Sequence, residues 1–252
     1  MLKQARTILF VGCSFTYGSG LQYEYLYKKG HSPDEFNKDI NATIPISLDY
    51  KADEYRKQHN WPNLVAKELN KPFIHGTYCN AGSNICEILG SIKHTNLLTK
   101  ASVKNSIELV VVQFTDWLRD VDRVDKEYIT IQDFIDTTIM NQVKQVVDAC
   151  EELVDESESS WPKWVGLSWR EDIGNYLKKH YPDNFIPIQY KGKEYVSFDY
   201  ISDYNQAVGN STALPIEEGL RLCDSIPGLE DYHLNSKGCK VIANSILRKL
   251  NI

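Results

Sequence analysis

Two residues far apart in the sequence, Ser14 and His233, have the side chains that acyl transfer requires. A serine hydroxyl becomes a nucleophile only when a base accepts its proton, and that base needs a group to orient it. Ser14 follows the apolar run Ile8–Val11 and Gly12, which together predict a buried strand ending in a turn. Because ligands of open α/β sheets bind beyond the carboxyl ends of the strands, Ser14 is placed to act as a nucleophile. A turn serine that caps a helix is the simpler alternative.

His233 lies in a loop just before the last helical pattern of the chain, and Glu230 and Asp231 lie directly upstream. A carboxylate two or three residues before a loop histidine can accept a hydrogen bond from its Nδ1–H. That bond leaves Nε2 facing a serine and stabilises the imidazolium when it forms. The alternative is a surface histidine beside acidic neighbours.

Other kinds of site find no support in the sequence. The remaining histidines lie in polar stretches or, for His75, at the end of a short predicted strand. The six cysteines show no Cys-x-x-Cys pairing and indicate free thiols, with neither a zinc site nor a disulfide framework. The glycines around Ser14 lack both the lysine of a phosphate-binding loop and the spacing of the dinucleotide fingerprint. We therefore expect no metal and no cofactor.

The charge of the chain narrows its range of partners. A formal net charge of −6 over 252 residues argues against nucleic acid or an anionic membrane as the main partner. No apolar run approaches ~18 residues, and the first residues show no signal-peptide pattern. We therefore expect a cytoplasmic protein without a transmembrane segment. The sequence predicts no particular oligomeric state.

The elements that must position these residues alternate between strands and helices, which is typical of a doubly wound α/β sheet. Ile107–Val112 is the strongest predicted strand and suits the middle of a parallel sheet. We expect further strands at 72–74, 185–188 and 195–198, and helices at about 61–69, 85–92, 131–154, 173–180 and 236–250. Residues 21–60 are polar and weakly periodic, so we interpret them as an inserted excursion, with a lid as one role, within a single domain of residues 1–252.

Four blocks of the sequence resemble those of the SGNH (GDSL-type) hydrolases in order and rough spacing, over nearly the whole chain. Their family patterns are Gly-Asp-Ser-x-x-x-Gly, a glycine-containing turn, Gly-x-Asn-Asp after a strand, and Asp-x-x-His before the last helix. The corresponding segments here are Val11–Gly18, Asn80–Asn84, Val111–Asp116 and Glu230–Asn235.

The resemblance implies a flavodoxin-like three-layer α/β/α sandwich and the hydrolysis of esters, commonly acyl groups on carbohydrates or lipids. By position it makes Ser14 the nucleophile and His233 the general base. Asp231 is the favoured acid, because shortened Asp-x-His motifs occur among relatives, and Glu230 is the alternative. The backbone N–H groups of Ser14 and Gly82 would form the oxyanion hole, where each donor is worth a few kcal/mol.

Two departures from the family pattern bear on activity. Cys13 stands at a structural position where the family usually has aspartate. Thr115 stands where the family has the asparagine that completes the oxyanion hole, and a threonine hydroxyl is shorter. Unless Asn84 or Gln113 substitutes for that asparagine, the loss of one donor lowers the rate ~10²–10³-fold.

Tyr17 in the first block and Trp117 after the third are the candidate substrate-binding residues. Arg119 is a further candidate, and a solvated helix start is the alternative for Trp117 and Arg119. The blocks together favour a serine esterase, most simply a deacetylase, that acts on a carbohydrate or another small ester. The Gln113-x-Thr115 pattern is similar to divergent family members found in bacteriophage genomes. A catalytically impaired binding or virion-associated protein and an O-acyltransferase are the alternative functions.

Overall fold

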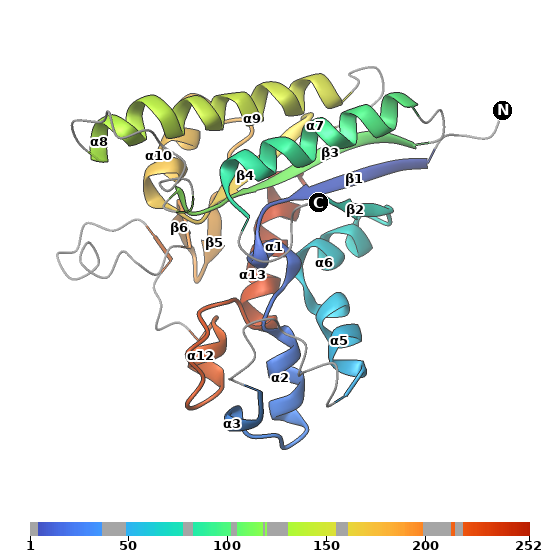
Figure 1. Cartoon of the computed structure of the whole chain (residues 1–252), viewed down its shortest axis with the longest axis vertical. Coiled ribbons are helices and arrows are strands. Elements are labelled where there is room, and N and C mark those ends of the chain that lie inside the picture. The colour runs from blue at the N-terminus through green and yellow to red at the C-terminus, as the bar shows by residue number, and fades with distance from the viewer. Residues whose placement is uncertain are drawn as a thin grey trace.

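A computed structural model gives the architecture of the chain (Figure 1). The residues that it describes are 5–36, 49–77, 83–101, 105–117, 119, 131–154, 161–198, 213–214 and 219–252. Among the helices of these residues, none combines the length and the apolar character that a membrane crossing requires.

A four-stranded parallel sheet forms the centre, with the strands in the order β2-β1-β3-β4 (Figure 1). The strands are β1 (Ala5–Val11), β2 (Phe73–His75), β3 (Asn105–Phe114) and β4 (Trp164–Ser168). The apolar runs Ile8–Val11 and Leu109–Val112 of the two central strands are fully buried, because helices cover both faces of the sheet. Val11 and Val112 are paired near the carboxyl edge of the sheet, so the segments that follow β1 and β3 begin side by side.

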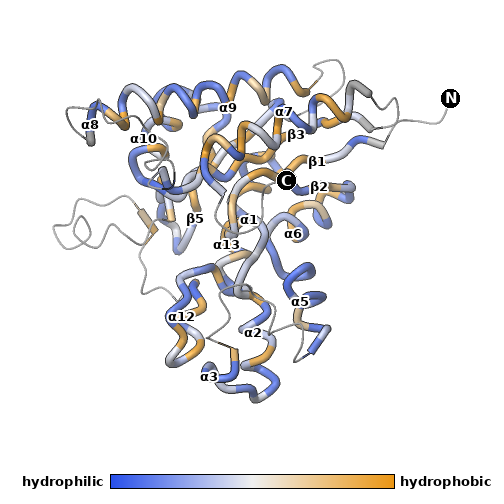
Figure 2. Tube along the Cα trace, in the orientation of Figure 1, coloured by the Kyte–Doolittle hydropathy of each residue, from blue (hydrophilic) through white to orange (hydrophobic). Residues whose placement is uncertain are grey.

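Helices on both faces complete three layers (Figure 1). One face packs against α7 (Ile85–Ala101), α10 (Glu171–His180) and the run α8 (Ile131–Phe134), η2 (Ile135–Ile139) and α9 (Met140–Leu153). The other face packs against α6 (Trp61–Glu68) and α13 (Ser236–Lys249). Figure 2 shows hydrophobic and hydrophilic residues alternating along α9, as expected for a helix with one buried face. The predicted α/β fold with a central parallel sheet is confirmed.

A third and smaller apolar cluster lies beyond the sheet layers. It joins α2 (Leu21–Lys28), α3 (Pro33–Phe36) and α5 (Lys51–His59) to α12 (Leu222–Ser225), and these helices lie together below the sheet in Figure 1. Its buried side chains are Leu26, Phe36, Ala52, Leu222, Ile226 and Leu229. The described part of the predicted excursion therefore shares a core with the segment that precedes α13.

Most of the predicted elements are found where the patterns place them, including the strands β1, β2 and β3 and the helices α6, α7, α9, α10 and α13. The segment after α10 differs from the prediction. The strands expected at 185–188 and 195–198 are replaced by a separate antiparallel hairpin, β5 (Ile188–Tyr190) and β6 (Lys193–Tyr195). The edge strand β4 was not predicted.

Candidate active site

The chain leaves β1 through a turn at Gly12 and enters the four-residue helix α1, which begins at Ser14. The turn needs glycine because a Cβ at position 12 would collide with the side chains of Thr16 and Gln113. Gln113 Oε1 accepts hydrogen bonds from Cys13 N at 3.2 Å, from Cys13 Sγ at 3.1 Å and from Thr16 Oγ1 at 3.1 Å. The end of β3 therefore holds the turn that carries Ser14.

Side chains from α5, from α6 and from Asn60 between them also hold α1. Trp61 Nε1 donates to Phe15 O at 3.1 Å. Arg56 Nη1 and Asn60 Nδ2 donate to Tyr17 O at 2.9 and 3.3 Å. The last carbonyls of a helix have no partner within it, so these bonds satisfy groups that the short α1 leaves open.

Ser14 and His233 are in hydrogen-bond contact although 219 positions separate them in the sequence. His233 Nε2 lies 2.8 Å from Ser14 Oγ, and His233 Nδ1 lies 2.6 Å from Asp231 Oδ1. The same carboxylate oxygen accepts the backbone N–H of His233 at 2.8 Å, which fixes the acid against the ring. Glu230 is exposed. Of the two predicted acids, the structure brings Asp231 to the histidine and leaves Glu230 at the surface.

Backbone hydrogen bonds fix the loop that carries His233. The first two backbone N–H groups of α12 donate to the carbonyl oxygens of His233 and Asp231, both at 2.9 Å. The Arg221 guanidinium, which is buried, donates to Tyr232 O at 3.0 Å. Asn235 caps α13 directly after the loop. Hydrogen bonds therefore fix the backbone both before and after His233, and this holds the imidazole in place.

An aromatic wall lies beside the imidazole. The ring of Phe15 is 4.6 Å from the His233 ring, centroid to centroid, and 4.0 Å from the ring of Trp169. Phe198 packs against both Phe15 and Trp169. Apolar neighbours exclude water and strengthen the electrostatic interactions within the site.

Of the two predicted backbone donors of the oxyanion hole, only Ser14 lies among the described residues. Gly82 lies outside the described residues. The backbone N–H of Ser14 donates to no acceptor in the described part of the chain, so it is available to a ligand. Asn84 Oδ1 accepts from Glu87 N at 2.9 Å, and Glu87 Oε2 accepts from Asn84 N at 3.1 Å. This reciprocal pair is a capping box, so the Asn84 side chain serves the start of α7.

Thr115 and Gln113 are both fully buried. Thr115 Oγ1 accepts a hydrogen bond from Arg119 Nη1 at 3.1 Å. Gln113 Nε2 donates to Phe114 O at 2.9 Å, while its oxygen serves the turn before Ser14. The amide of Gln113 is thus committed to the turn, which corrects the expectation that it could replace the missing oxyanion donor.

The two predicted substrate-binding aromatic residues differ in their surroundings. Tyr17 is half-buried, and the Arg56 guanidinium lies 3.7 Å from its ring centroid. Trp117 is 5% exposed, packs against Phe134 and donates from Nε1 to Asp172 Oδ2 at 2.6 Å. Trp117 therefore has the environment of a core residue. A role of either ring in substrate binding stays a prediction.

The histidine at the end of β2 is distinct from this site. Burial and, to a smaller extent, the nearby Arg56 guanidinium lower the pKa of His75 to about 4. His75 is therefore neutral at pH 7. Its buried Nδ1 has no partner among the described residues.

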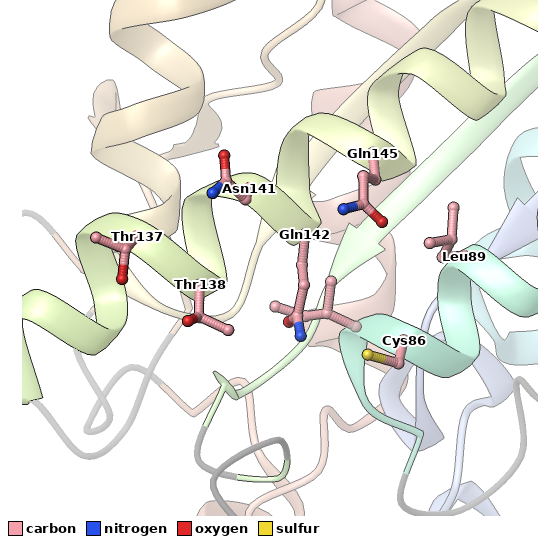
Figure 3. Close-up of a pocket in the computed structure, with 8 residues that line it drawn as sticks. Cys86, Leu89, Thr137, Thr138, Asn141, Gln142 and Gln145 are labelled. Atoms are coloured by element: carbon pink, nitrogen blue, oxygen red, sulfur yellow. The ribbon is translucent and has the colours of Figure 1, made fainter. Parts of the chain in front are cut away.

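A pocket of about 450 Å³ opens between α7 and the run of η2 and α9 (Figure 3). Its lining is uncharged and mostly polar and consists of Ile85, Cys86, Leu89, Thr137, Thr138, Asn141, Gln142 and Gln145. Neither Ser14 nor His233 belongs to this lining. Within the described ranges no group of three or more His, Cys, Asp or Glu side chains could hold a metal ion, and the five cysteines in those ranges are free thiols.

Sequence reasoning missed the supporting role of Gln113. The available signal was a polar residue near the end of an apolar strand that runs beside the strand of Ser14. Sequence reasoning also missed the contact of Arg119 with Thr115, for which the four-residue spacing is a weak signal because many such pairs face solvent.

No family model and no curated protein matches the chain. Solved structures with a similar fold are lipolytic, esterase and α/β-hydrolase proteins. A member of the lipolytic protein G-D-S-L family from Veillonella parvula is 10% identical, with 97% of each chain covered and a TM-score of 0.47. A mutant of an acetyl-xylooligosaccharide esterase from Geobacillus stearothermophilus is 11% identical, with 100% of this chain and 97% of that chain covered and a TM-score of 0.48. The α/β-hydrolase LAE5 from the Lake Arreo metagenome is 10% identical, with 98% of this chain and 96% of that chain covered and a TM-score of 0.47. At these identities and TM-scores the matches assign no role to any residue of this chain.

Proposed function

We propose that the protein is a serine ester hydrolase in which Ser14 is the nucleophile, His233 the general base and Asp231 the acid that orients it. The observation that carries the proposal is the pair of hydrogen bonds on the imidazole, 2.8 Å to Ser14 Oγ and 2.6 Å to Asp231 Oδ1. A hydroxyl, an imidazole and a carboxylate joined in this order form the arrangement that activates a serine for acyl transfer.

The reaction proceeds in two halves. Ser14 Oγ bonds to the carbonyl carbon of the ester, its proton moves to His233 Nε2, and the π electrons of the carbonyl move onto its oxygen. When that electron pair returns, the bond to the leaving alcohol breaks and His233 gives the alcohol its proton. Water then attacks the acyl group in the same way, with His233 taking its proton, and collapse releases the acid and returns a proton to Ser14.

The substrate of this proposal is a small acyl ester, with acetyl on a carbohydrate or on another small alcohol as the first choice. The resemblance of the four sequence blocks supports that choice. The backbone N–H groups of Ser14 and Gly82 are the proposed donors to the carbonyl oxygen. The first of them is supported because the Ser14 N–H donates to no acceptor among the described residues.

The 2.8 Å contact also bears on the alternative functions. An impaired binding or virion-associated protein is expected to have other side chains packed between the serine and the histidine, and the direct hydrogen bond counts against it. An O-acyltransferase would form the same acyl-enzyme and pass the acyl group to an alcohol instead of water. No feature of the described residues favours that variant.

Ser14→Ala tests the proposal with p-nitrophenyl acetate as substrate and a fluorophosphonate as covalent probe. We expect kcat to fall by roughly 10⁴- to 10⁶-fold, because the nucleophile is removed, and we expect mass spectrometry to place the fluorophosphonate on Ser14 of the parent. Ser19→Ala, a few residues along the same segment, is the matched control and should retain activity and labelling. Equal hydrolysis by Ser14→Ala and the parent, with no label on Ser14, would refute the proposal.

A further inference from the structure

Arg119 has hydrogen-bonding capacity that the described part of the chain does not use. Its Nη1 donates to Ser83 O and to Thr115 Oγ1, both at 3.1 Å, and its guanidinium lies 5.3 Å from the ring centroid of Trp169. Within the described residues it forms no ion pair with a carboxylate, and its Nε and Nη2 groups have no acceptor. An arginine stays charged at any relevant pH and carries five donors in a planar fork. Arg119 is therefore a half-buried cation with donors left for a ligand.

The neighbouring polar side chains are less accessible than Arg119. Thr115 and Gln113 have no exposed surface, and Asn84 is 3% exposed, with its Oδ1 fixed by the hydrogen bond from Glu87 N at the start of α7. Thr115 also receives the hydrogen bond of Arg119 and so fixes where the guanidinium lies. Thr115 is accordingly a positioning residue, and Arg119 is the group that can reach a ligand.

Two sets of contacts place the guanidinium at the same edge of the sheet as Ser14. The strands β1 and β3 are neighbours, and Gln113 of β3 bonds to the turn before Ser14, so Thr115 follows β3 where Ser14 follows β1. From the other direction, Trp169 contacts both Arg119 and Phe15, and Phe15 contacts His233.

We propose that Arg119 donates a hydrogen bond to the carbonyl oxygen of the acyl group as Ser14 attacks, in the place that the sequence pattern gives to Thr115. This inference rests on the proposed ester hydrolase function. In the ground state the guanidinium faces a neutral carbonyl, whereas in the tetrahedral intermediate it faces a full negative charge. The hydrogen bond then becomes charge-assisted on both sides, and no proton is transferred. Such an interaction is stronger in the transition state than with bound substrate, so it acts on kcat rather than on KM.

The test compares Arg119→Met, Arg119→Lys and Thr115→Val, with neutral p-nitrophenyl acetate as substrate. We expect Arg119→Met to lower kcat about 100-fold with little change in KM, which is the effect of losing one oxyanion donor. Arg119→Lys, which keeps the charge, should recover part of kcat. Thr115→Val should lose less than Arg119→Met, because Ser83 and Trp169 still hold the guanidinium. Arg248→Met, in the exposed last turn of α13, is the control for removing a positive charge.

Three results would overturn the assignment. The first is an unchanged kcat in Arg119→Met while the fluorophosphonate still labels Ser14, which would leave the proposed function standing. The second is a loss confined to the KM of an ester that carries a carboxylate, such as p-nitrophenyl hemisuccinate, since Arg119 would then bind a substrate charge. The third is the absence of fluorophosphonate label on Ser14 of the parent together with equal hydrolysis by Ser14→Ala and the parent. That result would refute the proposed function and this inference together. If Arg119→Met does not fold, Arg119→Gln, which removes the charge but keeps a neutral donor, is measured in its place, with a smaller loss of kcat expected and the same results overturning the inference.

Discussion

Gln113 shows, at the scale of a single residue, how the turn that carries Ser14 is held. One carbonyl oxygen accepts from the backbone and the thiol of Cys13 and from the hydroxyl of Thr16. The amide is fully buried, so water cannot replace it when it is removed. The position of the serine therefore depends on a side chain of the neighbouring strand.

Gln113→Leu removes this acceptor and keeps a side chain of similar size. Each buried donor left without a partner costs about 1–3 kcal/mol, so we expect the free energy of unfolding to fall by at least that amount. We also expect kcat for p-nitrophenyl acetate to fall, because the turn is free to shift. Denaturant unfolding and steady-state kinetics measure the two effects. Gln145→Leu, on the exposed side of α9, is the control. A folded Gln113→Leu with parental kcat would contradict the prediction.

At this scale the sequence was sufficient for the contact between Ser14 and His233 and for the preference of Asp231 over Glu230. The pairing of the serine with the histidine rests on residue type and on the predicted elements, whereas the preference for Asp231 rests on the resemblance to family members with a shortened Asp-x-His motif. The hydrogen bond from Arg119 to Thr115 could not be predicted from the sequence, because it depends on how the fold places these two side chains. The core-like surroundings of Trp117 could not be predicted either, because its neighbours Phe134 and Asp172 come from other elements.

Two helices from opposite ends of the sequence are joined through one buried carboxylate. Glu24 of α2 accepts hydrogen bonds from the backbone N–H and the hydroxyl of Ser236, at 2.8 and 2.7 Å, where α13 begins. Burial raises the pKa of Glu24, but the hydrogen bonds from Lys28 and Ser236 lower it more, so it lies below its ordinary value of 4.5. Helix α2 is thereby fixed to the segment that follows His233.

Glu24→Gln tests this link through its dependence on pH. A carboxyl whose pKa is lowered by folding stabilises the protein fully above pH 4.5, and this stabilisation is lost as the pH falls through the folded-state pKa. We expect Glu24→Gln to lower the free energy of unfolding at pH 7 by about 1.5–3 kcal/mol and to reduce the loss of stability in acid. Unfolding curves at several pH values measure both. Glu54→Gln, an exposed neighbour on α5, should leave the curves unchanged, and an identical acid slope in the parent and Glu24→Gln would rule the link out.

Long periodic patterns predicted elements well, whereas short irregular ones did not. The central strands and helices such as α9 and α13 have enough apolar residues at a fixed period to be recognised. Strand β4 has five residues with Gly166 at its middle, which weakens the pattern. The structure explains that glycine, because a Cβ there would lie 3.0 Å from the Trp164 ring and 3.1 Å from the Phe114 ring. The helices between 21 and 60 escaped prediction since their few buried residues meet partners from around residue 222.

The whole molecule has two large apolar clusters, one on each face of the sheet, and the small third cluster beyond them. The third cluster contains both Leu26 of α2 and Leu222 of α12, and α12 donates backbone hydrogen bonds to the loop of His233. A loss of packing in the third cluster should therefore affect the site more than an equal loss of packing in a sheet cluster.

Leu26→Ala and Leu177→Ala form a matched pair, because both leucines are fully buried, one in the third cluster and one on α10 in a sheet cluster. We expect each substitution to cost about 2–5 kcal/mol of stability. Only Leu26→Ala should also lower kcat, measured well below the unfolding transition. Equal kcat values in the two variants would show that the third cluster does not support the site.

The 219 positions between Ser14 and His233 have a consequence for the newly made chain. A ribosome adds about 5–20 residues per second, so the serine is synthesised roughly 10 to 40 seconds before its base. Throughout that interval the hydroxyl lacks the imidazole of His233. If Ser14 is the nucleophile that we propose, the nascent polypeptide therefore gains its esterase activity only when the segment of His233 and the last helix have folded onto the sheet.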